Sequence, residues 1–180
     1  MMNAIEKFNI TATEMSENGN EAVFVAEPLV RGYGITLGNS LRRVLLSTLP
    51  GYAATSIKID GVLHEISPCQ GVKEDVPEIV LNVKGIVAKL ECEGPKTVVI
   101  DVTGPCNVTA GDIKQDSDIE ILNPNPHIAT VGENERFYME LTFDHGRGYV
   151  SQDKNKQNNS PVIGLIYTDS IYTPAYNVSY

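Results

Sequence analysis

The sequence lacks the features by which chains reach or cross a membrane. None of its runs approaches the roughly 18 consecutive apolar residues that a membrane-spanning helix needs. Its first residues, Met1 to Thr11, lack the basic region followed by an apolar stretch that marks a secretory signal. We therefore expect a cytoplasmic protein with no membrane partner.

Cysteine and positive charge are also scarce. The three cysteines, Cys69, Cys92 and Cys106, are odd in number and form no C-x-x-C pair, which argues against a disulfide framework and a structural zinc site. The 14 basic residues are outnumbered by 23 acidic ones, so the net charge is -9 and the pI is near 4.8. We therefore expect no direct contact of this region with DNA.

No cluster of polar residues points to catalysis or to a metal. His64, His127 and His145 lie outside the motifs of metal-dependent and serine hydrolases. Residues 116–120 begin like a calcium loop, but Ile121 and His127 stand where such a loop requires glycine and glutamate. We expect no catalytic residue, no metal and no cofactor.

The residues that are present predict an α+β fold with a mostly antiparallel sheet. Alternating segments rich in β-branched and aromatic residues predict strands. These are expected at residues 22–26, 54–60, 97–102 and 137–143. Asp60-Gly61, between two apolar runs, predicts a hairpin. Only two segments have helical periodicity.

Charge is distributed unevenly along the chain. Residues 1–50 carry a net charge of -1, residues 51–171 carry -8, and residues 172–180 carry none. This difference predicts two regions with different surfaces and a boundary near Pro50-Gly51. The polar run at residues 151–160 has little to bury and predicts a mobile loop.

The first predicted helix, residues 37–49, has two different faces. Thr36 is its expected N-cap, and Pro50 followed by Gly51 is expected to stop it. At about 100° per residue, one face is apolar and should pack on a sheet or a partner. It consists of Leu37, Leu41, Val44 and Leu45.

The opposite face of this helix groups Asn39, Arg42, Arg43 and Leu46. A leucine among cations predicts a docking surface, because a solvated face normally holds polar groups only. The simpler alternative is that the arginines are solvated charges beside one exposed leucine.

Glycines precede the same helix and offer a second functional hypothesis. Gly32, Gly34 and Gly38 resemble a dinucleotide-binding turn, whose amides and helix dipole hold a pyrophosphate, and Asp60 could bind the ribose. This alternative predicts a nucleotide-binding oxidoreductase. It requires an apolar strand running directly into Gly32, but Pro28 and Arg31 intervene.

The second helix is predicted at residues 75–84. Asp75 can cap it, and Pro77 is tolerated in its first turn. Its buried stripe consists of Val76, Ile79, Val80 and Val83. Lys84 at its end complements the helix dipole, which by itself accounts for a lysine there.

Several segments, in order along nearly the whole chain, carry a resemblance to a known family. They are Arg31–Leu46 (RGYGITLGNSLRRVLL), Ile59–Glu65, Thr109–Ile113, Glu120–Pro124, Gly146–Val150 and Tyr172–Pro174. Together they resemble the amino-terminal domain of the bacterial RNA polymerase alpha subunit. The first segment is the most specific of them.

This resemblance implies a non-catalytic scaffold in transcription. The family forms a homodimer on which the large polymerase subunits, beta and beta prime, assemble. It implies a dimerisation domain made of residues 1–50 and 172–180, with a β-rich domain inserted at residues 51–171. It also implies that the family's chain continues beyond the position of Tyr180, so we expect the apolar face of the first helix to be incompletely covered here.

The resemblance also implies roles for individual residues. It places Arg43 and Leu46 at the beta-subunit contact, which we extend to Asn39, Arg42 and Arg31. It assigns Lys84 to the beta prime contact, so that one protomer would use Arg43 and the other Lys84. The dimer interface is then the apolar face of the first helix, formed by Leu37, Leu41, Val44 and Leu45.

Overall fold

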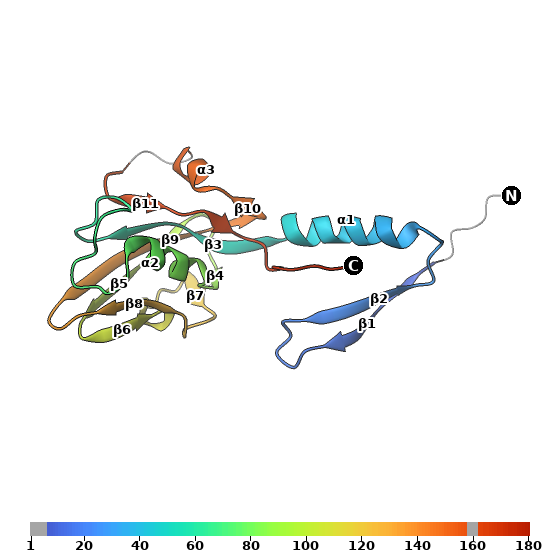
Figure 1. Cartoon of the computed structure of the whole chain (residues 1–180), viewed down its shortest axis with the longest axis horizontal. Helices are drawn as coiled ribbons and strands as arrows, with labels where there is room; N and C mark the ends of the chain where they lie inside the picture. The colour runs from blue at the N-terminus through green and yellow to red at the C-terminus, as the bar shows by residue number, and fades with distance from the viewer. Residues whose placement is uncertain (1–6, 158–161) are drawn as a thin grey trace. The chain divides into compact units, whose positions relative to one another are not determined.

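The computed structural model of the chain describes residues 7–157 and 162–180 and divides into two compact units (Figure 1). One unit is Met1–Val44 with Val178–Tyr180, and the other is Leu45–Asn177. The predicted division into a dimerisation domain and an inserted domain has nearby boundaries, and as a functional division it stays a prediction.

The first unit contains a hairpin and most of a helix. Strands β1 (Asn9–Met15) and β2 (Ala22–Glu27) pair antiparallel, which confirms the strand predicted at residues 22–26. Helix α1 (Tyr33–Ser47) follows. None of the described residues of this unit is buried, so the unit has no core of its own.

Helix α1 begins four residues earlier than the sequence predicted. Thr36 is therefore not the N-cap but lies within the helix, where its carbonyl accepts a hydrogen bond from the Ser40 hydroxyl at 2.8 Å. Gly32, immediately before the helix, has a φ of 85°, which glycine adopts without strain. The predicted end was also wrong, since α1 stops at Ser47 and Pro50 already belongs to the next strand.

The second unit is built on an antiparallel sheet, which confirms the α+β class. Its strands are β3 (Pro50–Ile59), β4 (Ala88–Leu90), β5 (Lys96–Thr103), β6 (Cys106–Thr109), β7 (Ile119–Ile121), β8 (His127–Val131), β9 (Arg136–Arg147), β10 (Tyr149–Val150), β11 (Leu165–Tyr167) and β12 (Ser170–Ile171). A four-stranded sheet has the order β11-β3-β9-β5, and the pairs β4-β7, β6-β8 and β10-β12 surround it. Strands β3, β5 and β9 confirm the three remaining strand predictions.

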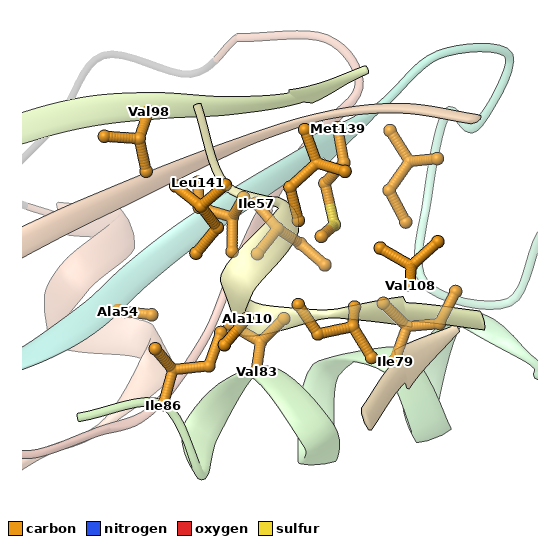
Figure 2. Packing of buried hydrophobic residues seen from close by; sticks show 14 of the residues in the cluster. Ala54, Ile57, Ile79, Val83, Ile86, Val98, Val108, Ala110, Met139 and Leu141 are labelled. Carbon is orange, nitrogen blue, oxygen red and sulfur yellow. The ribbon is translucent and has the colours of Figure 1, made fainter. Parts of the chain in front are cut away.

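The core lies between one face of this sheet and helix α2 (Val76–Lys84). Strand β9 buries every second side chain toward it, from Phe137 to Phe143, because successive residues of a strand point to opposite faces. In Figure 2, Ile57 and Leu141 lie on the face of the sheet that is turned toward α2. Ile79 and Val83 lie on the side of α2 that is turned toward the sheet. Burying each such side chain contributes about 1.5–3 kcal/mol.

Helix α2 matches its prediction closely. Asp75 occupies the N-cap position but its side chain makes no capping hydrogen bond, Pro77 lies in the first turn, and Lys84 lies in the last. The buried residues Val76, Ile79 and Val83 form the predicted stripe, with Val80 half-buried. Asn82 fixes the helix to β8, because its side-chain amide donates to the Ile128 carbonyl at 3.1 Å.

Two local predictions were wrong. Asp60-Gly61 does form a turn, with a φ of 75° at Gly61, but an irregular loop follows and β3 pairs with β9 and β11 instead of forming a hairpin there. The predicted mobile loop contains α3 (Gln152–Gln157), because the Asn155 amide finds buried partners in the Thr168 carbonyl and the Ser170 hydroxyl. The last part of that loop lies outside the described residues.

A buried carboxylate joins the start of α2 to β8. Glu74 is 8% exposed, and its oxygens accept hydrogen bonds from the Thr130 amide at 2.6 Å and the Thr130 hydroxyl at 2.8 Å. His127 Nε2 lies 2.9 Å from the same carboxylate. Burial alone would raise the pKa of Glu74, but the hydrogen bonds from Thr130 and His127 outweigh it and lower that pKa to about 2.

We predict that Glu74→Gln lowers the free energy of unfolding by roughly 1–3 kcal/mol at neutral pH. The folded-state pKa is below the unfolded value, so this stabilisation is fully present above about pH 4.5 and is lost as the pH falls toward 2. Urea titrations at pH 7 and pH 3 measure it. Glu78→Gln, on the exposed side of α2, is the control. Equal losses for both variants at pH 7 would contradict the prediction.

Candidate interaction surface

Among the described residues, the apolar face of α1 is left partly exposed to solvent. Leu41 is 42% exposed and Val44 is 47% exposed, while Leu37 and Leu45 are half-buried. No residue of α1 is buried. A helix with one apolar face is normally stable only when that face packs against another surface. The arrangement therefore offers an apolar surface for a partner.

The opposite face of α1 presents its polar residues to solvent. Asn39, Arg42 and Arg43 are exposed, as is Arg31 just before the helix. Leu46 is half-buried, and so is more shielded than Leu41 or Val44. Residues three apart are neighbours on a helix surface, so α1 itself places Arg43 beside Leu46.

The last residues of the chain lie against α1 within the first unit. Arg42 donates a hydrogen bond from Nη1 to the Val178 carbonyl at 2.5 Å. The Tyr180 ring lies so close to Gly38 that a Cβ there would be 2.4 Å from the ring. This contact was not predicted from the sequence, although a glycine in a helix interior often marks a close approach.

We predict that the effect of Gly38→Ala on stability depends on whether Tyr180 is present. Alanine is better than glycine in a helix by about 1 kcal/mol, but here its Cβ must displace Tyr180. In the natural chain the substitution should therefore gain little or lower the thermal midpoint. In a Tyr180→Ala background the same substitution should raise it. Thermal unfolding followed by circular dichroism compares the four chains, and equal shifts in both backgrounds would contradict the prediction.

Lys84, at the end of α2, forms an ion pair with Asp169. Its side chain is 21% exposed, and that of Asp169 is 30% exposed. The helix dipole explains a cation at this end of the helix. It does not explain the pairing, which tertiary structure creates from residues far apart in the sequence. Asp169 carried no sequence signal that could have identified it.

The structure gives the calcium-like segment a different role. Lys96 Nζ lies 2.8 Å from an oxygen of Asp116 and 2.6 Å from one of Asp118. Hydrogen bonds from Lys96 lower the pKa of Asp116. In the described parts of the chain, no group of three or more metal-binding side chains comes together.

The dinucleotide-binding interpretation of the glycines is wrong. Gly34 and Gly38 lie inside α1, so they form no loop whose amides could hold a pyrophosphate. Strand β2 ends at Glu27 and belongs to a two-stranded antiparallel sheet. Every strand pairing found in residues 7–157 and 162–180 is antiparallel, whereas a dinucleotide fold needs a parallel sheet.

None of the helices described could span a membrane.

Comparison with known proteins gives consistent matches. A family model described as "RNA polymerase Rpb3/RpoA insert domain" matches residues 57–173. The DNA-directed RNA polymerase subunit alpha of Clostridium kluyveri is 58% identical over 176 residues, covering 98% of this chain and 56% of that protein. The proteins of the same name from Clostridium beijerinckii and Clostridium botulinum strain Hall are 56% and 57% identical, with the same coverage. The chain thus spans about half the length of the curated relatives it matches.

Proposed function

The chain belongs to the RNA polymerase Rpb3/RpoA insert domain family, and on this basis we propose that it acts as the alpha subunit of DNA-directed RNA polymerase. Its role is that of a scaffold in the cytoplasm that contributes no catalytic residue. Two copies pair and hold the beta and beta prime subunits. The uncovered apolar face of α1 is the observation that carries this proposal.

A second copy of the chain is the partner we propose for that apolar face. Leu37, Leu41, Val44 and Leu45 recur at helical spacing, so two such helices can pack their ridges into each other's grooves. The first unit has no core among its described residues, and pairing would give it one. Removing Leu41 and Val44 from water would then favour the dimer.

The other face of α1 is the proposed contact with the beta subunit. Arg43 and Leu46 form its centre, with Asn39, Arg42 and Arg31 around them. An arginine beside an aliphatic side chain is well suited to an interface, because its planar group makes paired hydrogen bonds while the leucine is desolvated. The Arg42 bond to Val178 implies that Arg42 acts partly by holding the chain's last residues on the helix.

Lys84 is the proposed contact with the beta prime subunit. Its ammonium group has three donors, so the Asp169 ion pair leaves donors for a carboxylate of a partner. The two contacts lie on different elements, α1 and α2. One protomer of the pair can therefore use Arg43 while the other uses Lys84, and two identical chains would bind two different subunits.

We predict that Leu41→Glu abolishes pairing. A charge in the middle of the apolar face would have to be buried without a partner in the dimer, which is strongly unfavourable. Light scattering should give the mass of two chains for the natural protein and of one chain for the variant. Leu63→Glu, at an exposed leucine of the loop after β3, should leave the mass unchanged. A one-chain mass for the natural protein would overturn the proposed pairing.

We predict that Arg43→Ala weakens binding of the purified beta subunit at least tenfold, as is typical of a central interface residue. Arg43→Lys should recover only part of the loss, because lysine cannot make paired hydrogen bonds. Arg136→Ala is the matched control, since Arg136 of β9 is an exposed arginine paired with Asp101 of β5. Unchanged binding by the Arg43→Ala variant would remove the beta assignment.

A further inference from the structure

Strand β7 and the segment before it form a hairpin whose two arms separate. An isolated antiparallel bridge joins Asp116 to Ile119 across the turn. If this pairing continued, Lys114 would lie opposite Ile121, because the arms of a hairpin run in opposite directions. Instead, the Lys114 amide donates to the Val99 carbonyl of β5 at 2.9 Å. The first arm therefore leaves β7 and follows β5.

A cleft of about 450 Å³ lies where the arms separate, and we call it the β7 cleft. It is lined by β7 and Pro124, by Ala110 and Gly111 of the 3-10 helix η1 (Ala110–Asp112), and by residues 113–117. Ala110, Ile113 and Ile119 are buried, so the floor of the cleft is apolar. Binding sites commonly combine such a floor with a few polar groups at fixed positions.

The edge of β7 that faces the cleft has unused backbone groups. The Leu122 amide donates to the Val87 carbonyl at 2.9 Å, on the side of β4. Hydrogen bonding alternates along an antiparallel strand, so Ile121 turns its N–H and C=O away from β4. Within residues 7–157 and 162–180, neither group of Ile121 has a hydrogen-bond partner. An open strand edge of this kind can pair with another extended chain.

Ion pairs with β5 hold the first arm of the hairpin in place. Lys96 binds both Asp116 and Asp118, on either side of the turn. Lys114 Nζ lies 3.2 Å from a carboxylate oxygen of Asp101. The arm therefore does not have to be ordered by a ligand. A preformed cleft reduces the entropic cost of binding, so that even a short peptide can be bound.

The charges around the cleft favour a basic partner. Three carboxylates, those of Glu91, Asp116 and Glu120, line it together with a single cation, Lys114. Residues 45–177 as a whole carry 18 acidic and 10 basic side chains. The field of this unit therefore attracts basic segments and repels acidic ones.

We propose that the β7 cleft binds an extended, basic peptide segment of another protein. The segment adds to β7 as a strand and pairs its backbone with the N–H and C=O of Ile121. Ile119 and Ile121 lie on one face of β7 and Glu120 on the other, so a segment with alternating apolar and basic side chains matches both faces. The site uses none of the residues assigned to the beta and beta prime contacts, and it does not rest on the proposed function.

The test titrates a short blocked peptide of alternating lysine and valine, labelled with a fluorophore, with the 180-residue chain. Fluorescence anisotropy gives the Kd. Ile121→Pro removes the N–H at the open edge, a position where a strand tolerates proline because that N–H makes no bond to β4. We expect binding to weaken about fivefold. Ile121→Val keeps the N–H and is the matched control, with near-normal binding.

Two further measurements test the charge and the position of the peptide. Glu120→Gln should weaken binding about threefold, whereas Glu133→Gln, at an exposed glutamate between β8 and β9, should not. Hydrogen exchange of the Ile121 amide, followed by NMR in the unmodified chain, should slow about tenfold when the peptide is bound. This last measurement needs no variant and decides the matter if Ile121→Pro lowers the thermal midpoint.

Saturable binding that is weakened by Ile121→Pro and Glu120→Gln, together with slower exchange at Ile121, supports the proposal. It is overturned by the absence of saturable binding at millimolar peptide, by an equal Kd for a peptide of alternating glutamate and valine, or by unchanged exchange at Ile121. Normal binding by a folded Ile121→Pro chain overturns the strand pairing. Exchange at Ile121 that slows with chain concentration in the absence of peptide would identify a second copy as the occupant and also overturn the proposal.

Discussion

The inward-facing row of β9 is the constraint on which the second unit depends. Phe137, Met139, Leu141 and Phe143 are all buried, and β9 is hydrogen-bonded to β3 on one side and to β5 on the other. A shift of one residue in either register would turn this row to solvent. The core fixes α2 against the sheet and β8, and α2 in turn fixes where Lys84 meets Asp169. The geometry of the proposed beta prime contact therefore depends on residues that are buried in the core.

The first unit follows the opposite principle. Its hairpin and the greater part of α1 bury no described residue, and exposed apolar side chains occur on both, including Phe24 and Leu41. Two-stranded hairpins and single helices are marginal in water unless an apolar face is covered. The free energy that orders this unit would then come largely from association, so folding and assembly would be coupled there. A second unit with its own core, attached to a first unit that depends on association, would suit the proposed scaffold, in which identical chains accommodate different neighbours.

The sequence predicted the elements whose signals are local. Strand β9 alternates strictly and was placed within one residue at its start, although it continues four residues beyond the predicted end. Helix α2 has an aspartate at the N-cap position, a first-turn proline and an apolar stripe, and it was placed within one residue. The start of α1 was missed because its glycines were read as a turn, although Gly38 is required by the Tyr180 ring. Short strands such as β10 and β12 have too few residues for a pattern. The partners of Lys84, Arg42 and Glu74 lie far away in sequence, and only the folded chain brings them together.

Thr168, Ser170 and Tyr172 are buried and alternate with more exposed residues, which makes the β12 segment intolerant of changes in length. Inserting one residue after Thr168 would turn each following side chain of this segment to the opposite side. The Ser170 hydroxyl could no longer donate its hydrogen bond to the Ala54 carbonyl, and the Ile171 side chain would point to the buried side. Point substitutions at the outward positions leave this hydrogen bond in place. By this geometry alone, the segment tolerates a changed side chain at an outward position better than a changed number of residues.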